Sequence, residues 1–263
     1  MSSLQGKVVW ITGASSGIGE ALAYQASAQG ARLILSARRE AELQRVRAAC
    51  AHPEAVAILP LDLTDFDALD ASARAEASFG PVDILVNNAG ISQRSTVLET
   101  SMAVYRRIFE LDFFACVALT QALLPGMVAR RQGHVVVISS VVGYVGTPLR
   151  SGYAAAKHAL HGFYDAACAE LWRENIHFTL VCPGFIKTQV SLNAITADGG
   201  QHGRMDEGQA RGMAPDECAR QIWKAVARRR EEVLIGRREA IFVRLKRYAP
   251  WLMSFALKRA KVT

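Results

Sequence analysis

The sequence predicts an α/β fold: a doubly wound, mostly seven-stranded parallel sheet with helices on both faces. The chain has 263 residues, of which 51% are hydrophobic and 21% charged, enough apolar material for one buried core of this size. Short β-branched apolar runs alternate with stretches of helical pattern, as expected where each strand is followed by a crossover helix. The runs are continuously apolar, which is typical of strands buried on both faces. This composition excludes a disordered chain.

The expected elements follow one another regularly from residue 8 onwards. Seven strands are expected at Val8–Thr12, Arg32–Ser36, Ala55–Leu59, Ile84–Val86, Val135–Ser139, His177–Val181 and Val233–Ile235. Helices are expected at about 18–28, 40–50, 65–78, 101–130, 152–174 and 215–229. Because no repeat, low-complexity tract or linker divides the chain, residues 1–263 are predicted to form a single domain.

Two segments depart from this alternation. Residues 188–213 are rich in glycine and polar residues with scattered apolar side chains, and an irregular segment of this length is more often a binding lid than a connection. The C-terminal segment, 237–263, is basic and amphipathic. Counted from Arg220, the chain carries 13 Lys/Arg and 3 Asp/Glu, whereas the first 219 residues carry 18 and 21. The net charge of +7 is therefore a C-terminal feature.

The basic segment has more than one explanation. Apolar and aromatic residues mixed with Lys and Arg suit a helix in a lipid interface, although Pro250 would break or kink it. The same pattern suits a helix that covers the active site or packs against a second subunit while its basic side chains reach water. No nucleic-acid motif accompanies the charge, so we expect no nucleic-acid partner.

The cysteines and the chain start favour a cytoplasmic protein. Five cysteines lie far apart with no CxxC pair and are expected to be reduced, mostly buried thiols: Cys50, Cys116, Cys168, Cys182 and Cys218. The first residues lack an export-signal pattern, and no uncharged apolar run reaches the ~18–20 residues of a spanning helix. Any contact with the inner face of a membrane would be peripheral. His158 and His161 have no third ligand at zinc spacing, so no metal is expected.

A glycine-rich turn follows the first expected strand. It reads Thr12-Gly13-Ala14-Ser15-Ser16-Gly17-Ile18-Gly19 and leads into a helix. Glycines let the backbone approach a pyrophosphate, and the helix directs its free N–H groups at the anion. The spacing Gly-x3-Gly-x-Gly differs from the Gly-x-Gly-x-x-Gly of the wider dinucleotide-binding class, and a tight turn alone would also need glycine. We predict cofactor contacts in this turn at Gly13, Ser15, Ser16, Gly17, Ile18 and Gly19.

The end of the second expected strand is basic where an NAD-binding protein usually places a carboxylate for the ribose 2′-hydroxyl. It reads Ser36-Ala37-Arg38-Arg39. No carboxylate there repels a 2′-phosphate, and Arg38 can pair with that phosphate through a planar donor fork. If these arginines only faced solvent at the N-terminus of the next helix, their positive charge would be unfavourable beside the positive end of the helix dipole. We therefore expect NADP(H) in preference to NAD(H), with Arg38 as a contact.

Further motifs follow the later strands. They are Asn87-Asn88-Ala89-Gly90, Ser139-Ser140, Tyr153-x-x-x-Lys157 and Pro183-Gly184. Tyr153 and Lys157 share one helix face, and an ammonium beside a phenol stabilises the phenolate. The phenol pKa starts near ~10 and must fall toward neutrality for proton exchange. Lys157 and the positive nicotinamide ring of a bound cofactor are expected to supply this shift together. Ser140 can hold a carbonyl or alkoxide oxygen while hydride moves to or from carbon.

Taken together and in this order, the motifs resemble the short-chain dehydrogenase/reductase family over almost the whole chain. The resemblance implies a Rossmann-type NAD(P)-binding domain that acts on CH–OH groups. It implies that Tyr153 is the acid/base, that Lys157 also grips the nicotinamide ribose, and that Ser140 orients the substrate. Besides Tyr153 and Lys157, it implies cofactor contacts at strand ends: Asp62, Leu63, Asn88, Ala89, Gly90, Pro183, Gly184, Ile186 and Thr188.

One position departs from the family pattern. Where the family carries an asparagine in the helix after Asn88, this chain reads Phe109-Glu110-Leu111-Asp112-Phe113. Asp112 is isosteric with asparagine, but its charge would stabilise the Lys157 ammonium and compete for it. We include Asp112 as a fourth catalytic residue.

The substrate is expected to be hydrophobic. Residues 191–199 with Met205-Asp206 resemble one branch of the family that is linked to lipid-type substrates and in part to membranes. The pocket is expected between Ile91–Arg94, Val141–Pro148, Phe185 and the 188–213 lid. The expected activity is that of a carbonyl reductase or alcohol dehydrogenase. The alternative, suggested by Asp112, is an NADP-binding scaffold or redox sensor with little turnover. The resemblance also implies a homodimer or homotetramer through helices 101–130 and 152–174.

Overall fold

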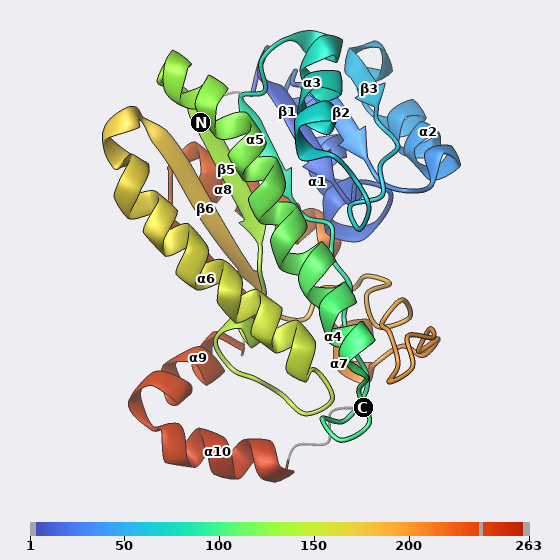
Figure 1. The fold of residues 1–263 in the computed structure, drawn as a ribbon, viewed down its shortest axis with the longest axis vertical. Helices are drawn as coiled ribbons and strands as arrows, with labels where there is room; N and C mark the ends of the chain where they lie inside the picture. The colour runs from blue at the N-terminus through green and yellow to red at the C-terminus, as the bar shows by residue number, and fades with distance from the viewer. Residues whose placement is uncertain (1–3, 237–238, 260–263) are drawn as a thin grey trace.

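The computed structural model describes residues 4–236 and 239–259. Its described strands form one parallel sheet in the order β3-β2-β1-β4-β5-β6-β7 (Figure 1). The strands are β1 Val8–Thr12, β2 Arg32–Ser36, β3 Val56–Ile58, β4 Ile84–Asn87, β5 Gly133–Ile138, β6 Ile176–Pro183 and β7 Glu232–Ile235. The predicted doubly wound fold is confirmed. The assignment of a single domain stays a prediction.

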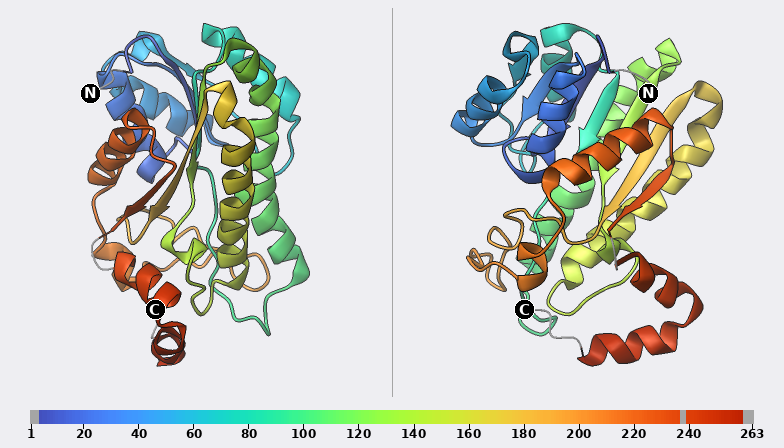
Figure 2. Two further views of the ribbon diagram at one scale, coloured as in Figure 1. Left: turned by 90° about the vertical axis from the view of Figure 1, so that its left-hand side faces the viewer. Right: turned by 180° about the vertical axis from the view of Figure 1, so that it is seen from behind.

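Helices cover both faces of the sheet (Figures 1 and 2). They are α1 Gly17–Ala28, α2 Glu40–Ala49, α3 Ala68–Phe79, α4 Met102–Phe109, α5 Ala115–Arg130, α6 Ser151–Leu171, α7 Glu207–Ala210, α8 Pro215–Ala227, α9 Glu239–Tyr248 and α10 Pro250–Arg259. One apolar core lies under α1, α2 and α8 and takes Val9 and Ile11 of β1. A second core lies under α3, α5 and α6 and takes Val8 and Trp10. Alternate residues of the same strand thus supply the two cores, which explains the continuous apolar runs.

Several predicted boundaries are wrong for local reasons. The helix expected from 65 begins at Ala68, because the Asp67 side chain accepts from the amides of Leu69 and Asp70 and caps it. The strand expected at 55–59 is shorter, because a 3₁₀ turn occupies Pro53–Ala55. Within the C-terminal segment, the described residues form two helices, and the second begins at Pro250, where proline fits the first helical position.

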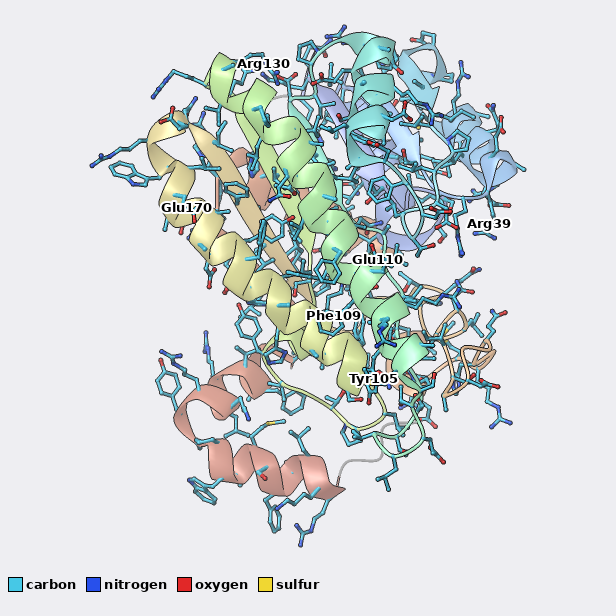
Figure 3. All side chains as sticks on the ribbon, in the orientation of Figure 1. Arg39, Tyr105, Phe109, Glu110, Arg130 and Glu170 are labelled. Atoms are coloured by element: carbon cyan, nitrogen blue, oxygen red, sulfur yellow. The ribbon has the colours of Figure 1, made fainter. Side chains whose placement is uncertain are left out.

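The helix expected at 101–130 is continuous but contains a wider turn. A π-helical turn, Glu110–Phe114, joins α4 to α5, and Figure 3 shows Phe109 and Glu110 where α4 passes into it. Among the described helices, this stretch is the one whose length and composition would allow it to cross a membrane. In the structure Leu119, Leu123 and Met127 of α5 lie buried against the sheet, as in a core helix of a folded domain.

The carboxyl ends of the strands all point to one end of the molecule. In Figure 1 this end lies below the sheet, where α9, α10 and the irregular 188–213 segment also lie. The order of the strands reverses at β1 and β4, which run in parallel with the register Val9 to Ile84. In sheets of this kind, ligands bind in the crevice outside the carboxyl ends at such a reversal.

Candidate active site

A cleft of about 1170 Å³ runs along the carboxyl ends of the strands. It extends from the glycine turn after β1, past the ends of β4 and β5, to the 188–213 segment and α10. The residues predicted for the site line it with one exception: Gly13, Ser15, Ser16, Gly17, Ile18, Arg38, Asp62, Leu63, Asn88, Ala89, Gly90, Asp112, Ser140, Tyr153, Lys157, Pro183, Gly184, Ile186 and Thr188. The exception is Gly19, which lies behind the turn.

The glycine turn is packed so closely that side chains would not fit. Gly13 has a φ of +63°, and a Cβ there would lie 2.8 Å from the Cα of Ala89. A Cβ on Gly19 would lie 2.5 Å from the Gly13 carbonyl oxygen. Asn88 holds the turn, because its Nδ2 donates to the carbonyls of Thr12 at 2.9 Å and Gly13 at 3.2 Å. Asn88 is predicted to contact the cofactor, and in the structure it also holds the glycine turn in place.

The turn suits a dinucleotide pyrophosphate. The first residue of α1 is Gly17, and the preceding Ser16 makes no side-chain cap bond, so the first amides of the helix are left for an anion. The cradle that a Cβ would fill at Gly13 continues into the cleft that holds Tyr153. The residues present therefore fit a nicotinamide dinucleotide stretched along the strand ends.

The far end of the cleft carries charges of both signs. Arg38 is exposed and lines it together with Asp62. Asp62 Oδ1 accepts from the Thr64 amide at 3.0 Å and from the Thr64 hydroxyl at 2.7 Å. Burial would raise the pKa of Asp62, but these bonds and the charges of Arg38 and Arg107 lower it below its ordinary value. The carboxylate is thus fixed beside the arginine.

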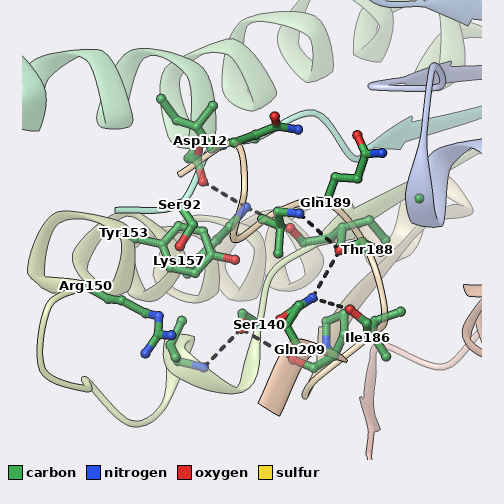
Figure 4. A pocket seen from close by; sticks show the side chains of 18 of the residues that line it. Ser92, Asp112, Ser140, Arg150, Tyr153, Lys157, Ile186, Thr188, Gln189 and Gln209 are labelled. Carbon is green, nitrogen blue, oxygen red and sulfur yellow. Dashed lines mark hydrogen bonds and ion pairs between the residues drawn. The ribbon is translucent and has the colours of Figure 1, made fainter. Parts of the chain in front are cut away.

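Tyr153 and Lys157 lie on the first turns of α6, and both side chains face the cleft (Figure 4). The Lys157 Nζ lies 5.6 Å from the centre of the Tyr153 ring. It donates to the Ile138 carbonyl at 3.0 Å and lies 3.4 Å from Asp112 Oδ2. The ammonium is thus buried and held between a strand end, a carboxylate and the phenol.

Asp112 lies in the middle of the π turn and is fully buried. Its Oδ1 accepts from the Ile91 amide at 2.8 Å, and its Oδ2 forms an ion pair with Lys157 but accepts no hydrogen bond from the described part of the chain. Burial raises the pKa of Asp112, whereas Lys157 and the Ile91 amide lower it less. Burial alone would lower the pKa of Lys157, but Asp112 and Tyr153 raise it above its ordinary value. The lysine is therefore charged across the neutral pH range.

Lys157 by itself does not bring the pKa of Tyr153 below its ordinary value, and the predicted shift also needs the positive nicotinamide ring. Burial raises the pKa of Tyr153 and outweighs the lowering by Lys157, while the carboxylate of Asp112 raises it further. Ser140 and Arg150 act in the lowering direction. Without a bound dinucleotide, the protein therefore keeps this phenol protonated at neutral pH.

Ser140 lies two residues after the end of β5 and caps the 3₁₀ turn Val141–Gly143. Its hydroxyl accepts from the Val142 amide at 3.3 Å and donates to the Pro183 carbonyl at 3.4 Å. The serine is thereby fixed between the ends of β5 and β6, on the side of the cleft where Tyr153 lies (Figure 4).

The sequence reasoning missed several residues of the cleft. Gln209 of α7 donates from its Nε2 to the Ile186 carbonyl and to the Thr188 hydroxyl, so it fastens the segment after β6. The buried carboxylate of Asp206 pairs with Arg94 and, at 2.8 Å, with Arg150. These pairs fix the 188–213 segment over the cleft, which favours its prediction as a lid.

The C-terminal helices form part of the cleft wall as well. Phe242 of α9 and three residues of α10 line it, namely Met253, Ala256 and Leu257. One of the alternatives considered for the C-terminal segment was a helix that covers the active site, and the described part of the segment does line the cleft. Residues 237–238 and 260–263 of the predicted segment lie outside the described residues.

The cysteines and histidines take no part in this site. All five cysteines are free, and four of them are buried, with burial raising the pKa of Cys116 and Cys182 to about 12. His161 Nε2 lies 3.1 Å from the Ser139 hydroxyl, behind the cleft. Within 4–236 and 239–259, no cluster of side chains has the composition of a metal site.

Comparison with known proteins agrees with this geometry. The family model for short chain dehydrogenases matches residues 7–198. The chain is 45% identical over 242 residues to a dehydrogenase/reductase SDR family protein 7-like of Anopheles gambiae, covering 89% of this chain and 76% of the relative. It is 43% identical over 270 residues to dehydrogenase/reductase SDR family member 7B of Xenopus tropicalis, covering 98% and 87%. Residues 191–199 with Met205-Asp206 resemble the branch of these member 7B relatives, so the predicted branch of the family is confirmed.

Solved structures agree as well. A short-chain dehydrogenase from Streptomyces avermitilis has a TM-score of 0.83 at 31% identity, covering 98% of this chain and 97% of the other. An enzyme from Burkholderia phymatum, solved in complex with NAD, has a TM-score of 0.84 at 24% identity, covering 100% and 98%, and supports the fold alone. The chain belongs to the short-chain dehydrogenase family, oxidoreductases that act on CH–OH groups with a nicotinamide cofactor.

Proposed function

We propose that the chain is an NADP-dependent oxidoreductase that interconverts a carbonyl and an alcohol on a hydrophobic substrate through Ser140, Tyr153 and Lys157. The observation that carries the proposal is the buried Lys157 ammonium, 5.6 Å from the centre of the Tyr153 ring, at the middle of the cleft. A phenol and a fixed cation at this spacing suit proton exchange with a substrate oxygen.

Each residue has a separate part in the proposed chemistry. With substrate bound, the Ser140 hydroxyl donates its one hydrogen to the substrate oxygen instead of the Pro183 carbonyl and fixes that oxygen near the phenol. Tyr153 gives its proton to the oxygen during reduction and takes it back during oxidation, while Lys157 stabilises the phenolate left behind. The nicotinamide, when bound, supplies or accepts the hydride. Its oxidised ring is positively charged, which favours the phenolate in the direction of oxidation and offsets the effect of burial on the Tyr153 pKa.

The preference for NADP(H) follows from Arg38. Its exposed guanidinium lines the far end of the cleft after β2, and Ala37 precedes it where a carboxylate would repel a 2′-phosphate. A planar, permanently charged donor fork is well suited to a phosphate dianion.

The walls of the cleft favour a hydrophobic substrate. Beyond Tyr153 they are formed by Val145, Ile195, Phe242, Met253 and Leu257. Such a wall, with a few polar groups near the reacting atoms, suits an aldehyde, ketone, steroid or lipid-like carbonyl compound. A cytoplasmic site of action and a homodimer or homotetramer through α4, α5 and α6 belong to the same proposal.

Cofactor titration followed by a turnover screen tests the proposal. NADPH should bind at least about tenfold more tightly than NADH, and Arg38→Ala should remove that preference while the neighbouring Arg39→Ala retains most of it. Fatty aldehydes, ketones and steroids are then screened with the wild-type protein and Tyr153→Phe. Turnover that the variant loses supports the enzyme. Tight cofactor binding without turnover of any compound would instead support an NADP-binding scaffold or redox sensor, and equal affinity for both dinucleotides would refute the role of Arg38.

A further inference from the structure

The helices α9 and α10 extend from the body of the protein at the mouth of the cleft. In Figures 1 and 2 they form the end of the molecule furthest from the sheet, with α10 outermost. The Glu239 carboxylate accepts from the Phe185 amide at 3.1 Å and fastens the start of α9 to the segment after β6. The pair is thus anchored at one end and has a wide outer surface.

The two sides of α10 differ in kind. Met253 and Leu257, four residues apart, line the cleft, and Met253 is only 4% exposed. Trp251, Phe255 and Lys258 lie at i, i+4 and i+7 and therefore share the opposite side. Trp251 is 74% exposed and Phe255 55%. Large aromatic side chains thus face water on a helix whose other side closes the active site.

Basic side chains surround these aromatic ones. Arg259 lies 3.7 Å above the Phe255 ring. On α9, Ile241 and Tyr248 are 60% and 84% exposed. Residues 239–259 hold five Lys/Arg and the single acid Glu239, which faces inward. We define the outer surface as the exposed apolar residues Ile241, Tyr248, Trp251, Leu252 and Phe255 with the basic residues Arg244, Lys246, Arg247, Lys258 and Arg259.

The positive charge of the outer surface favours one kind of partner over another. A second copy of the chain that docked through the same surface would bring like charges together across the contact, which is unfavourable. An anionic lipid surface complements them, because Trp and Tyr prefer the headgroup level of a bilayer and Lys and Arg pair with its phosphates and carboxylates.

We propose that the outer surface of α9 and α10 docks on the anionic surface of a lipid bilayer. The helices lie there in the plane of the interface, and Trp251 and Phe255 enter the headgroup region. The inner side of α10 remains part of the cleft wall, so the mouth of the active site opens beside the bilayer. Docking depends on this surface alone and does not require turnover.

Vesicle flotation with the full chain tests the proposal. The probes are vesicles of phosphatidylcholine alone and of phosphatidylcholine with about one third phosphatidylserine. Only the anionic vesicles should carry the protein, and added salt should release it. Lys246→Gln with Arg247→Gln should weaken binding about 25-fold, about fivefold for each charge. Lys224→Gln with Arg228→Gln, the same loss of charge on α8 and on the residue that caps it, is the matched control and should retain binding.

A second pair of variants tests the aromatic residues. Trp251→Ser with Phe255→Ser should abolish flotation while NADPH binding and the melting temperature stay unchanged, because neither side chain lines the cleft. In a Trp172→Phe background, Trp251 is the one exposed tryptophan among the described residues, so anionic vesicles should shift its emission to the blue. The proposal is overturned by absence of flotation with anionic vesicles, by an equal loss in the α8 control, or by self-association that depends on Trp251 and Phe255 without vesicle binding.

Discussion

Replacing Asp112 with asparagine should move the pH profile of turnover to lower pH. Asp112 Oδ2 lies 3.4 Å from Lys157 Nζ, and both side chains are buried. At an effective dielectric constant of about 20, two unit charges at this separation interact by about 5 kcal/mol. The same carboxylate raises the pKa of Tyr153, from further away and therefore by less. Its removal should lower the phenol pKa by on the order of one unit.

The assay is kcat/KM for alcohol oxidation between about pH 6 and pH 10. Oxidation needs the deprotonated phenol, so the rate rises with pH through the pKa of Tyr153, and the midpoint should fall by about one unit in Asp112→Asn. Carbonyl reduction needs the protonated phenol, so it should be lost at a correspondingly lower pH. The asparagine Oδ1 can still accept from the Ile91 amide, as Asp112 does, so the variant should fold.

The matched control is Glu110→Gln. It removes one negative charge from the same π turn, but from an exposed side chain, where water screens the charge. Its midpoint should stay within about 0.2 units of the parent. An unmoved midpoint in Asp112→Asn, or an equal shift in the control, would refute the assignment of this carboxylate to the proton balance of Tyr153.

Further predictions concern stability and cofactor binding. Asp206→Asn leaves the buried guanidiniums of Arg94 and Arg150 without their carboxylate, so the free energy of unfolding in urea should fall by about 3 kcal/mol at pH 7. The arginines lower the pKa of Asp206 although burial opposes them, so this contribution is present above about pH 4 and is lost as the pH falls through the folded pKa; the difference should shrink at about pH 3. Burial lowers the pKa of His134 to about 3. Below about pH 6.5 this histidine therefore binds a proton in the unfolded chain but not in the native state, which lowers the free energy of unfolding of the parent. His134→Gln should remove this loss, which is about 2 kcal/mol at pH 5. Gln209→Leu should weaken NADPH binding about tenfold in a fluorescence titration with kcat little changed, because the segment after β6 loses its donor.

The strands and the motifs could be predicted because both depend on local sequence. Continuous runs such as Leu33–Leu35 indicate strands buried on two faces, and every motif directly follows a strand or begins a helix. Since parallel strands end at one edge of a sheet, their order along the chain already brings Gly13, Ser140 and Tyr153 into one crevice. The cleft that these residues line agrees with that reasoning.

The rest of the site depends on contacts between distant segments. Asp206 is 112 residues from Arg94 and 56 from Arg150, and no spacing in the sequence points to such a triad. The sequence of the π turn has the pattern of an ordinary helix. Its Asp112 carboxylate contacts the Ile91 amide, which is a tertiary contact that no local pattern predicts. The effect of burial on the Tyr153 pKa also depends on tertiary structure, because burial outweighs the lowering by the neighbouring lysine.

The charges around Tyr153 indicate how the chain offsets its unusual aspartate. Asp112 and Lys157 are a buried pair of net charge zero, whereas an asparagine would leave the positive charge of Lys157 uncancelled. Arg150, at the start of α6, shares Asp206 with a second buried arginine, so that group carries a net charge of +1. Arg150 lowers the pKa of Tyr153 and Asp112 raises it. Arg150→Gln should therefore move the midpoint of the oxidation profile to higher pH, and the double variant with Asp112→Asn should return it close to that of the parent. Shifts of the two single variants in the same direction would refute the opposite effects assigned to these charges. A double variant far from the sum of the two shifts would show that the charges do not act independently.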